Sequence, residues 1–179
     1  MAKKIRIYLT GKLNKIFLTI SIILISNSWN NAFAIEQKLS FAVSGIISDI
    51  TVRPGQTVTA GTVLARLDLT QFKAKKKAFD AAVIAAELEY NIINERLEQI
   101  QQLYDDLSTS REELQNTKIQ EARARVALEI ARANAKTASW NLQHAVLSSP
   151  RSGIVRRIEG YAGLVVNPEA RFTPIVILD

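Results

Sequence analysis

The fold is decided by residues 79–107, which read FDAAVIAAELEYNIINERLEQIQQLYDDL. Uncharged, mostly apolar residues recur there at alternating intervals of four and three, a heptad rhythm that is typical of long packed helices. The series comprises Phe79, Val83, Ala86, Tyr90, Ile93, Leu97, Ile100, Tyr104 and Leu107. This pattern predicts the first arm of a coiled coil, with these residues along its seam.

A second series with the same spacing follows after a short polar interval. It comprises Leu114, Thr117, Glu121, Ala124, Leu128, Ala131, Ala135, Ala138, Leu142 and Ala145. Folding the arms back on each other places bulky residues of the first arm opposite alanines of the second, as with Tyr90 and Ala131. The sequence therefore predicts an antiparallel helical hairpin over residues 70–147, about 55 Å long. Its apex is expected between Ser110 and Arg111.

The segments on either side of the hairpin repeat each other. At a constant offset of 108, Gly45, Ile46, Ile47, Ile50, Gly55 and Val58 match Gly153, Ile154, Val155, Ile158, Gly163 and Val166. After a three-residue adjustment, residues 62–68 match residues 173–179. Since neither half of about 30 residues can bury a core alone, we expect both to form one β-domain, with the two helices leaving from the same edge. Chance similarity between β-rich segments is the alternative.

Three turns are predicted within these halves. Gly55 and Gly163 occupy matching positions, where a tight turn requires positive φ, and Asn167-Pro168 is typical of a turn in the second half. The predicted fold class is therefore α+β, a β-domain made of two half-motifs with a long antiparallel helical hairpin inserted between them.

Residues 1–34 have the composition of a secretory signal peptide. Basic residues precede the apolar stretch Ile16–Ile25, and Ala32-Phe33-Ala34 follows as a cleavage motif. The apolar stretch is half as long as the roughly 20 residues of a membrane-spanning helix. We therefore expect cleavage after Ala34 and a periplasmic protein, whereas retention would anchor the chain to the inner membrane.

The charge and the cysteine content exclude several classes of function. Five basic and no acidic residues precede residue 35, so the formal charge of +6 leaves 18 basic against 17 acidic residues in the remainder. This balance gives no indication of a nucleic-acid partner. The chain has no cysteine, which excludes disulfides, thiolate metal sites and a lipidated N-terminal cysteine.

The motifs around the hairpin resemble periplasmic adaptor proteins, also called HlyD or membrane fusion proteins. They are Ser44-Gly45-Ile46, Val52-Arg53-Pro54-Gly55-Gln56-Thr57-Val58, Ala60-Gly61-Thr62-Val63-Leu64 and Leu67-Asp68, followed after the hairpin by Leu147-Ser148-Ser149-Pro150-Arg151-Ser152-Gly153-Ile154-Val155. The resemblance implies a biotinyl-lipoyl-like domain with half-motifs at residues 35–69 and 148–179. No attached cofactor is expected, because the hairpin replaces the turn that carries the modified lysine in carrier domains.

The resemblance also implies partners. Adaptors of this family link an inner-membrane pump, of the resistance-nodulation-division (RND) or ATP-binding-cassette (ABC) kind, to a TolC-type outer-membrane channel, and they assemble as rings. Members usually add a β-barrel and a membrane-proximal domain, which residues 1–179 do not include. A short or split adaptor is therefore expected, and a non-transporting module that pairs with another adaptor or coiled coil remains the alternative.

Channel-docking adaptors carry near the tip an arginine, a leucine four residues later and a serine seven residues beyond it. Leu103 and Ser110 keep the last spacing, but the arginine position is Gln99, and Arg96 lies one turn earlier. Ser110 with Glu113 also forms a capping box that starts the second helix, and the two roles can coexist. The candidate partner-binding residues are Leu103, Ser110, Arg111 and Arg96.

A further apolar series lies away from the seam. It comprises Ala78, Ala81, Ala85, Leu88 and Ile92 on the first arm and Ile119, Ala122, Val126, Ile130, Ala133 and Trp140 on the second. These residues suggest lateral packing against other copies or a partner helix, with a merely broad stripe as the alternative. His144, the only histidine, is more typical of a structural role. Without a phosphate-binding loop, metal-ligand cluster or nucleophile with a base partner, the sequence predicts no enzyme activity and no metal.

Overall fold

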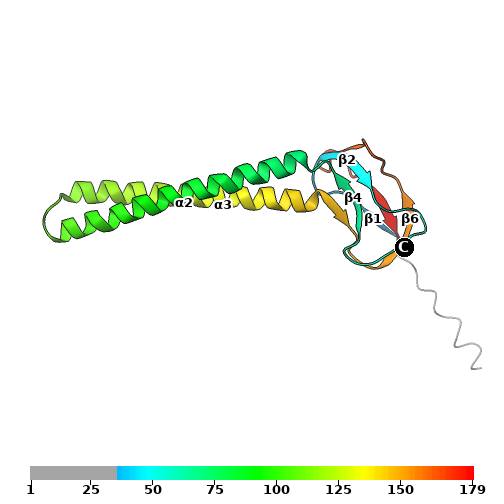
Figure 1. Ribbon diagram of the computed structural model, residues 1–179, viewed down its shortest axis with the longest axis horizontal. Helices are drawn as coiled ribbons and strands as arrows, with labels where there is room; N and C mark the ends of the chain where they lie inside the picture. Colours follow the sequence, from blue (N-terminus) through cyan, green and yellow to red (C-terminus); the bar gives the residue numbers. More distant parts are fainter. Residues whose placement is uncertain (1–35) are drawn as a thin grey trace, which may run out of the picture. The chain divides into compact units, whose positions relative to one another are not determined.

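The computed structural model describes residues 36–179 as one unit (Figure 1). The expected signal peptide and its cleavage site fall in residues 1–35, outside the described part. The elements are β1 (Gln37–Leu39), β2 (Gly45–Ile50), β3 (Thr57–Val58), β4 (Val63–Leu67), α2 (Thr70–Asp105), α3 (Arg111–His144), β5 (Val146–Ser148), β6 (Gly153–Ile158), β7 (Val165–Val166) and β8 (Val176–Leu178). The described protein is therefore α+β.

The strands form two four-stranded antiparallel sheets, with the orders β1-β8-β6-β3 and β5-β4-β2-β7. The bounds of β2 and β6 differ by the offset of 108 found in the sequence, and those of β3 and β7 do so as well. Each sheet contains strands from both halves, since β2 pairs with β7 and β6 pairs with β3. The two halves are therefore interleaved in one β-domain, as predicted.

The core of the β-domain is built by inward-facing residues of both sheets. The largest fully buried apolar side chains there are Ile47, Val58, Leu64, Leu67, Val155, Val166, Ile175, Val176 and Leu178. In β2 and β6 buried and exposed residues alternate at the start, as expected for strands with one covered face. Residues of both halves are buried in this single core, so neither half has to form a core of its own.

The predicted turns are present. Gly55 and Gly163 have φ values of 84° and 91°, a region that favours glycine because it lacks a Cβ atom. At Asn167-Pro168, the backbone N–H groups of Ala170 and Arg171 both donate to the Asn167 carbonyl oxygen. The turn chemistry read from the sequence is therefore confirmed at these positions.

The hairpin connects two neighbouring strands of one sheet. α2 follows β4 and α3 leads into β5, and these strands pair with Ala65 opposite Leu147 and Arg66 opposite Val146. Both helices consequently leave from the same edge of the β-domain, as predicted, and lie side by side along their length (Figure 1). At the root, Phe72 of α2 packs against the β-domain core.

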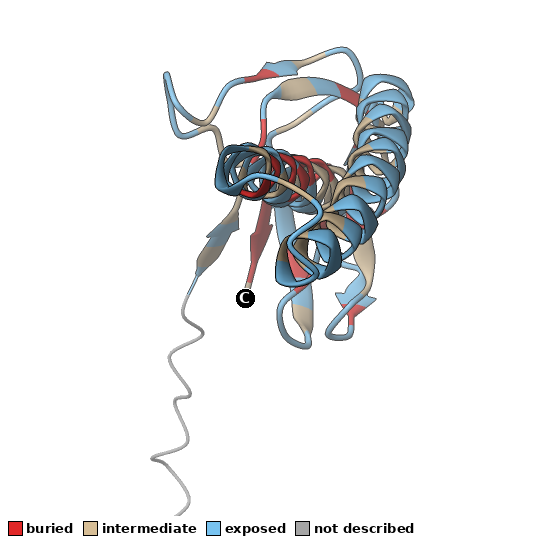
Figure 2. Ribbon diagram, turned by 90° about the vertical axis from the view of Figure 1, so that its left-hand side faces the viewer, coloured by how far each residue is buried: buried red, intermediate tan, exposed pale blue. Residues whose placement is uncertain are grey.

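The burial of α3 confirms the predicted seam. Its buried residues are Leu114, Thr117, Ala124, Leu128, Ala131 and Ala138, all of them seam positions. The seam residues of α2 from Phe79 to Tyr104 are only half-buried, while most residues between them are exposed (Figure 2). Small residues on α3 are covered by the larger side chains of α2, whereas those larger side chains extend beyond their small partners into solvent.

The predicted apex is wrong. The connection comprises residues 106–110, so its centre is Ser108, while Ser110 precedes α3 and Arg111 is its first residue. The opposed pairs are therefore displaced toward the start of α3. Two ion pairs between the helices support this displacement. Glu113 pairs with Arg96, and Arg132 pairs with Glu87. Each of these two α3 residues comes earlier in the chain than the residue that the sequence predicts opposite its α2 partner.

The last predicted seam position, Leu107, is also wrong. Leu107 lies beyond the end of α2 and has a φ of 58°, so it cannot continue the helix. The heptad spacing is kept at this position, but the helix has already ended.

Candidate functional site: the tip of the hairpin

α2 ends in a tight hydrogen-bonded turn. The Leu107 N–H donates to the Tyr104 carbonyl at 3.0 Å, and the Ser108 N–H donates to the Leu103 carbonyl at 2.7 Å. This is the Schellman arrangement, in which the residue with positive φ is usually glycine. A leucine in that conformation costs about 1–2 kcal/mol, so the tip carries backbone strain at Leu107.

The strained residue is also the most exposed large apolar side chain in the described chain. Leu107 is 93% exposed, and Leu103, one turn earlier, is 44% exposed. Acidic residues are close to them in the sequence, including Asp105, Asp106 and Glu112. Strain combined with exposure of an apolar group is costly for the free protein and is typical of an interaction site.

Leu107 was missed as a site residue because it continues the heptad. A signal for it exists in the sequence, since Asp105-Asp106 precedes it and Ser108-Thr109-Ser110 follows it. Aspartate, serine and threonine favour turns and helix ends over helix interiors. This run of six residues marks the connection better than the spacing of apolar residues does.

Ser110 caps α3, as predicted. Its Oγ accepts a hydrogen bond from the Glu113 N–H at 3.1 Å. The reciprocal bond of a capping box is replaced, because the Glu113 carboxylate accepts from Arg96 Nη2 at 3.2 Å. Leu103, Ser110 and Arg111 therefore lie at the tip. Arg96 lies further back along α2, and its ion pair with Glu113 connects the two helices. Their role in binding a partner stays a prediction.

The cap can be tested by substitution. Ser110→Ala removes the acceptor for the Glu113 N–H and should lower the stability of the hairpin by about 1 kcal/mol. Ser110→Asn keeps a side-chain oxygen and should cost only a few tenths of that amount. Thermal unfolding followed by far-UV circular dichroism compares the two variants. Equal losses would show that Ser110 stabilises the hairpin by something other than its cap.

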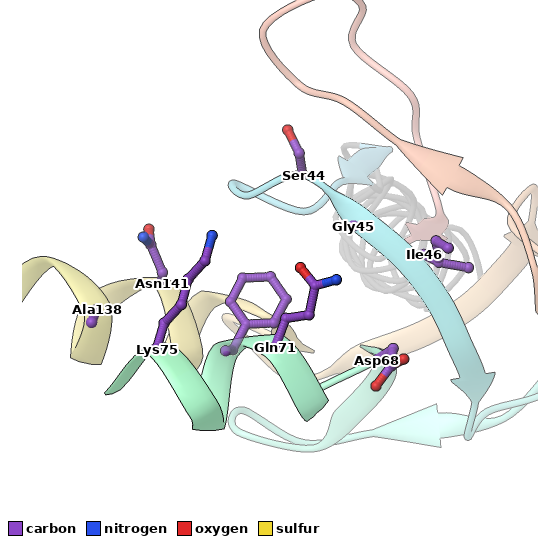
Figure 3. A pocket seen from close by; sticks show the side chains of 9 residues that line it. Ser44, Gly45, Ile46, Asp68, Gln71, Lys75, Ala138 and Asn141 are labelled. Carbon is purple, nitrogen blue, oxygen red and sulfur yellow. The ribbon is translucent and has the colours of Figure 1, made fainter. Parts of the chain in front are cut away.

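A small cleft lies at the other end of the hairpin, where its root meets the start of β2 (Figure 3). Its volume is about 190 Å³, and Phe72, Lys75 and Asn141 from the helices line it together with Ser44. Asp68 also lines it, but its Oδ1 accepts from the Thr70 N–H at 2.9 Å. That hydrogen bond holds the pKa of Asp68 below its usual value, so the carboxylate serves the start of α2.

His144 contacts Trp140 of its own helix, as a residue with a structural role does. Its ring stacks on Trp140 with 3.9 Å between ring centroids, and its Nδ1 lies 2.8 Å from the Trp140 carbonyl oxygen, so it closes the last turn of α3. Across residues 36–179, histidine and acidic side chains nowhere gather in a group of three that could hold a metal ion. The helices of the same part of the chain include none long and apolar enough to cross a membrane.

Comparison with known proteins identifies the fold. No protein-family model matches the sequence, and no curated protein matches it either. Solved structures do match. The membrane fusion protein Spr0693 of Streptococcus pneumoniae R6 has a TM-score of 0.59 at 19% identity, with 80% of this chain and 58% of that chain covered.

Two further solved structures have a similar fold. A MacA-MexA chimera containing the Pseudomonas aeruginosa MexA α-hairpin domain has a TM-score of 0.58 at 24% identity, covering 80% of this chain and 45% of the chimera. ZneB of Cupriavidus metallidurans has a TM-score of 0.58 at 15% identity, covering 83% and 61%. This chain therefore spans about half of the length of these proteins. Over its described residues it has the fold of the membrane fusion proteins, also called periplasmic adaptor proteins.

Proposed function

We propose that this chain is a periplasmic adaptor subunit of a tripartite efflux or type I secretion system. Its hairpin tip contacts a TolC-type outer-membrane channel, and the assembly includes an inner-membrane RND or ABC transporter. The protein acts without enzymatic chemistry or a cofactor, as a homo-oligomeric ring, and reaches the periplasm by a cleaved signal peptide. The observation that carries this proposal is Leu107, a strained and almost fully exposed leucine at the end of the hairpin.

The tip is suited to binding another protein. An exposed leucine can insert into an apolar groove of a partner, and the neighbouring Leu103 enlarges the apolar surface. Ser110 and Arg111, at the start of α3, supply polar groups for the contact. A partner that buries Leu107 recovers the free energy of apolar burial, about 1.5–3 kcal/mol for a full leucine side chain.

The proposal assigns residues 35–69 and 148–179 to the two half-motifs of a biotinyl-lipoyl-like domain. Support comes from the interleaved strands, since each half contributes to both sheets. It assigns the coiled-coil hairpin, expected over residues 70–147, to α2 and α3 at residues 70–144, because Val146 and Leu147 belong to β5; support comes from the seam positions that are buried on α3. In this arrangement the hairpin occupies the connection between β4 and β5, so the β-domain serves as a base for the arm.

Substitution of Leu107 should change the stability of the hairpin and the binding of the channel in opposite directions. Leu107→Gly relieves the positive-φ conformation and should raise the stability of the hairpin by about 1 kcal/mol, because glycine tolerates that conformation. The same change removes the apolar side chain and should abolish contact with the channel. Far-UV circular dichroism during thermal unfolding measures the first effect. A loss of stability would mean that Leu107 supports the fold, and the tip assignment would then fail.

Crosslinking in intact cells identifies the partner. A photoreactive amino acid at position 107 should capture an outer-membrane channel, and mass spectrometry of the product identifies it. The same group at Leu88, an exposed leucine on the side of α2, is the matched control and should not reach the channel. Capture at position 107 of another adaptor or a coiled-coil protein would contradict the channel contact and support the non-transporting interaction module instead.

A further inference from the structure

The side of α2 that faces away from α3 carries a row of exposed apolar residues. Ile84, Leu88 and Ile92 are each more than half exposed. At 3.6 residues per turn, they lie on the side of α2 opposite its seam residues, so α3 of the same hairpin cannot cover them. No residue of α2 is buried (Figure 2). We refer to these three residues as the outer row.

Charged residues are sorted by sign on the same side of α2. Lys73 and Lys77 lie between the outer row and the β-domain. Glu95 and Glu98 lie between the outer row and the tip. All four are exposed, and each lies within about a quarter turn of the line through Leu88. In residues 36–179 none of them takes part in an ion pair. From the β-domain to the tip, this side of α2 is therefore basic, then apolar, then acidic.

This order is complementary to itself when two α2 helices meet in opposite directions with their Leu88 residues facing each other. Ile84 of one copy then faces Ile92 of the other, because both are one turn from Leu88. Lys77 of one copy lies within one residue of the level of Glu98 of the other, so opposite charges meet. The two-fold symmetry makes each of these contacts twice.

The charge of the whole arm favours the same direction. Its half nearer the β-domain, residues 70–86 and 131–147, contains six basic residues and one acidic residue. Its half nearer the tip, residues 87–130, contains five basic and ten acidic residues. The two halves therefore carry formal charges of +5 and −5, with His144 counted as neutral. Attraction between unlike halves steers two arms into opposite directions as they approach.

Other pairings of like helices bring like charges together. Two α2 helices that point the same way would place Lys77 beside Lys77 and Glu98 beside Glu98. On α3, Lys118 and Lys136 flank the exposed Val126 at similar distances. Two antiparallel α3 helices centred there would therefore bring lysine close to lysine, and the repulsion would weaken the contact.

We infer that the outer side of α2 binds the same side of α2 in a second copy, forming an antiparallel dimer with its two-fold axis at Leu88. The contact uses one surface twice, so it closes at two copies. Each α2 spans the full length of the other, and Leu107 of one copy reaches the level of Leu69 in the other, where the β-domain begins. A large partner therefore reaches the tip only after the dimer opens. This resting form goes beyond the proposed function and does not depend on it.

Disulfide formation tests the two-fold axis, because the chain has no cysteine of its own. In the full-length chain, Leu88→Cys should give a disulfide-linked dimer on oxidation with copper phenanthroline, since the two copies of this position face each other. Ile84→Cys is the matched control. In the antiparallel dimer the two copies of position 84 are about 12 Å apart along the helix axis. A disulfide requires Cα atoms within about 7 Å, so this variant should give little product.

The double variant Ile84→Cys with Ile92→Cys tests closure. The two positions are too far apart to link within one helix, but each faces the other position in the second copy. Two disulfides should therefore form within one dimer, without larger products. A ladder of multimers would overturn the two-fold closure. Equal linking of the single Ile84→Cys and Leu88→Cys variants would overturn the antiparallel direction, and no linked product from Leu88→Cys would overturn the dimer.

Charge exchange tests the sorted charges independently. Lys73→Glu with Lys77→Glu should weaken dimerisation by about tenfold or more in sedimentation equilibrium, and Glu95→Lys with Glu98→Lys should do the same. Combining all four substitutions reverses both ends of the surface and should restore dimerisation to within about threefold of the original. Failure of the combined variant to dimerise, with its helicity intact in circular dichroism, would overturn the antiparallel pairing.

The matched control for charge exchange is on α3. Lys118→Glu with Lys136→Glu changes the charge by the same amount as the two lysine substitutions on α2, but on the other helix. Dimerisation should stay within about threefold of that of the unmodified chain, because α3 lies outside the contact. A loss as large as that of the α2 variants would overturn the assignment of the contact to α2.

Discussion

Leu128→Asp should unfold the helical hairpin. Leu128 is 3% exposed at the centre of the α3 seam, where the other buried residues are mostly alanine. The substitution removes one of the two buried leucines of α3 and places a carboxylate without a partner between the helices. Loss of apolar burial and desolvation of the charge together cost roughly 4 kcal/mol or more. Far-UV circular dichroism should show a large loss of helix at ambient temperature.

Ile130→Asp is the control for this change. It introduces the same side chain two residues later, but Ile130 is 57% exposed and is not among the buried seam residues of α3. Its helicity should therefore stay close to that of the unmodified chain. A comparable loss of helix in both variants would show that the seam does not carry the stability of the hairpin.

Leu67→Ala should destabilise the β-domain by about 2–5 kcal/mol. Leu67 is fully buried at the end of β4, and its N–H donates to the carbonyl of Ala145 at 2.9 Å, just before β5. The truncation leaves a cavity beneath the root of the hairpin. Urea denaturation measures the loss. Leu88→Ala, the same truncation at an exposed helical position, should change stability by no more than about 0.5 kcal/mol.

A second substitution checks that the cavity is the cause. A Cβ atom on Gly45 would lie 2.9 Å from Cδ1 of Leu67, so this strand position is tightly packed against that side chain. Gly45→Ala alone should therefore be destabilising. In the Leu67→Ala background its methyl group enters the vacated space and should recover part of the loss. Additive losses in the double variant would contradict this account.

The sequence predicted those parts of the fold that depend on short-range spacing. The heptad series on α3 contained every residue that the structure buries there, because helical periodicity determines which side of a helix is apolar. The repeat likewise predicted equivalent strands, such as β2 and β6. The exchange of β3 and β7 between the sheets was not predicted, because pairing between strands far apart in sequence leaves no local pattern.

The errors at the tip have a physical cause as well. Apolar spacing continues through Leu107, but the end of a helix is decided by backbone conformation and by hydrogen bonds to its last carbonyl groups. Ser110 was correctly assigned as a cap, and a cap lies before a helix, so it cannot also be the apex of the turn. Because the predicted apex was too late in the chain, the predicted pairs of opposed residues on the two helices were displaced as well.

The connection between β4 and β5 also bears on how the protein folds. These strands are neighbours in one sheet although residues 68–145 separate them along the chain. Closing a flexible loop of that length costs roughly 4 kcal/mol of chain entropy. Helices form from local contacts and so tend to precede distant strand pairing. Once α2 and α3 have paired, Leu67 and Ala145 are held close together, and the sheet no longer bears that entropic cost. Pairing of α2 with α3 therefore promotes pairing of β4 with β5, the two strands from which the hairpin extends.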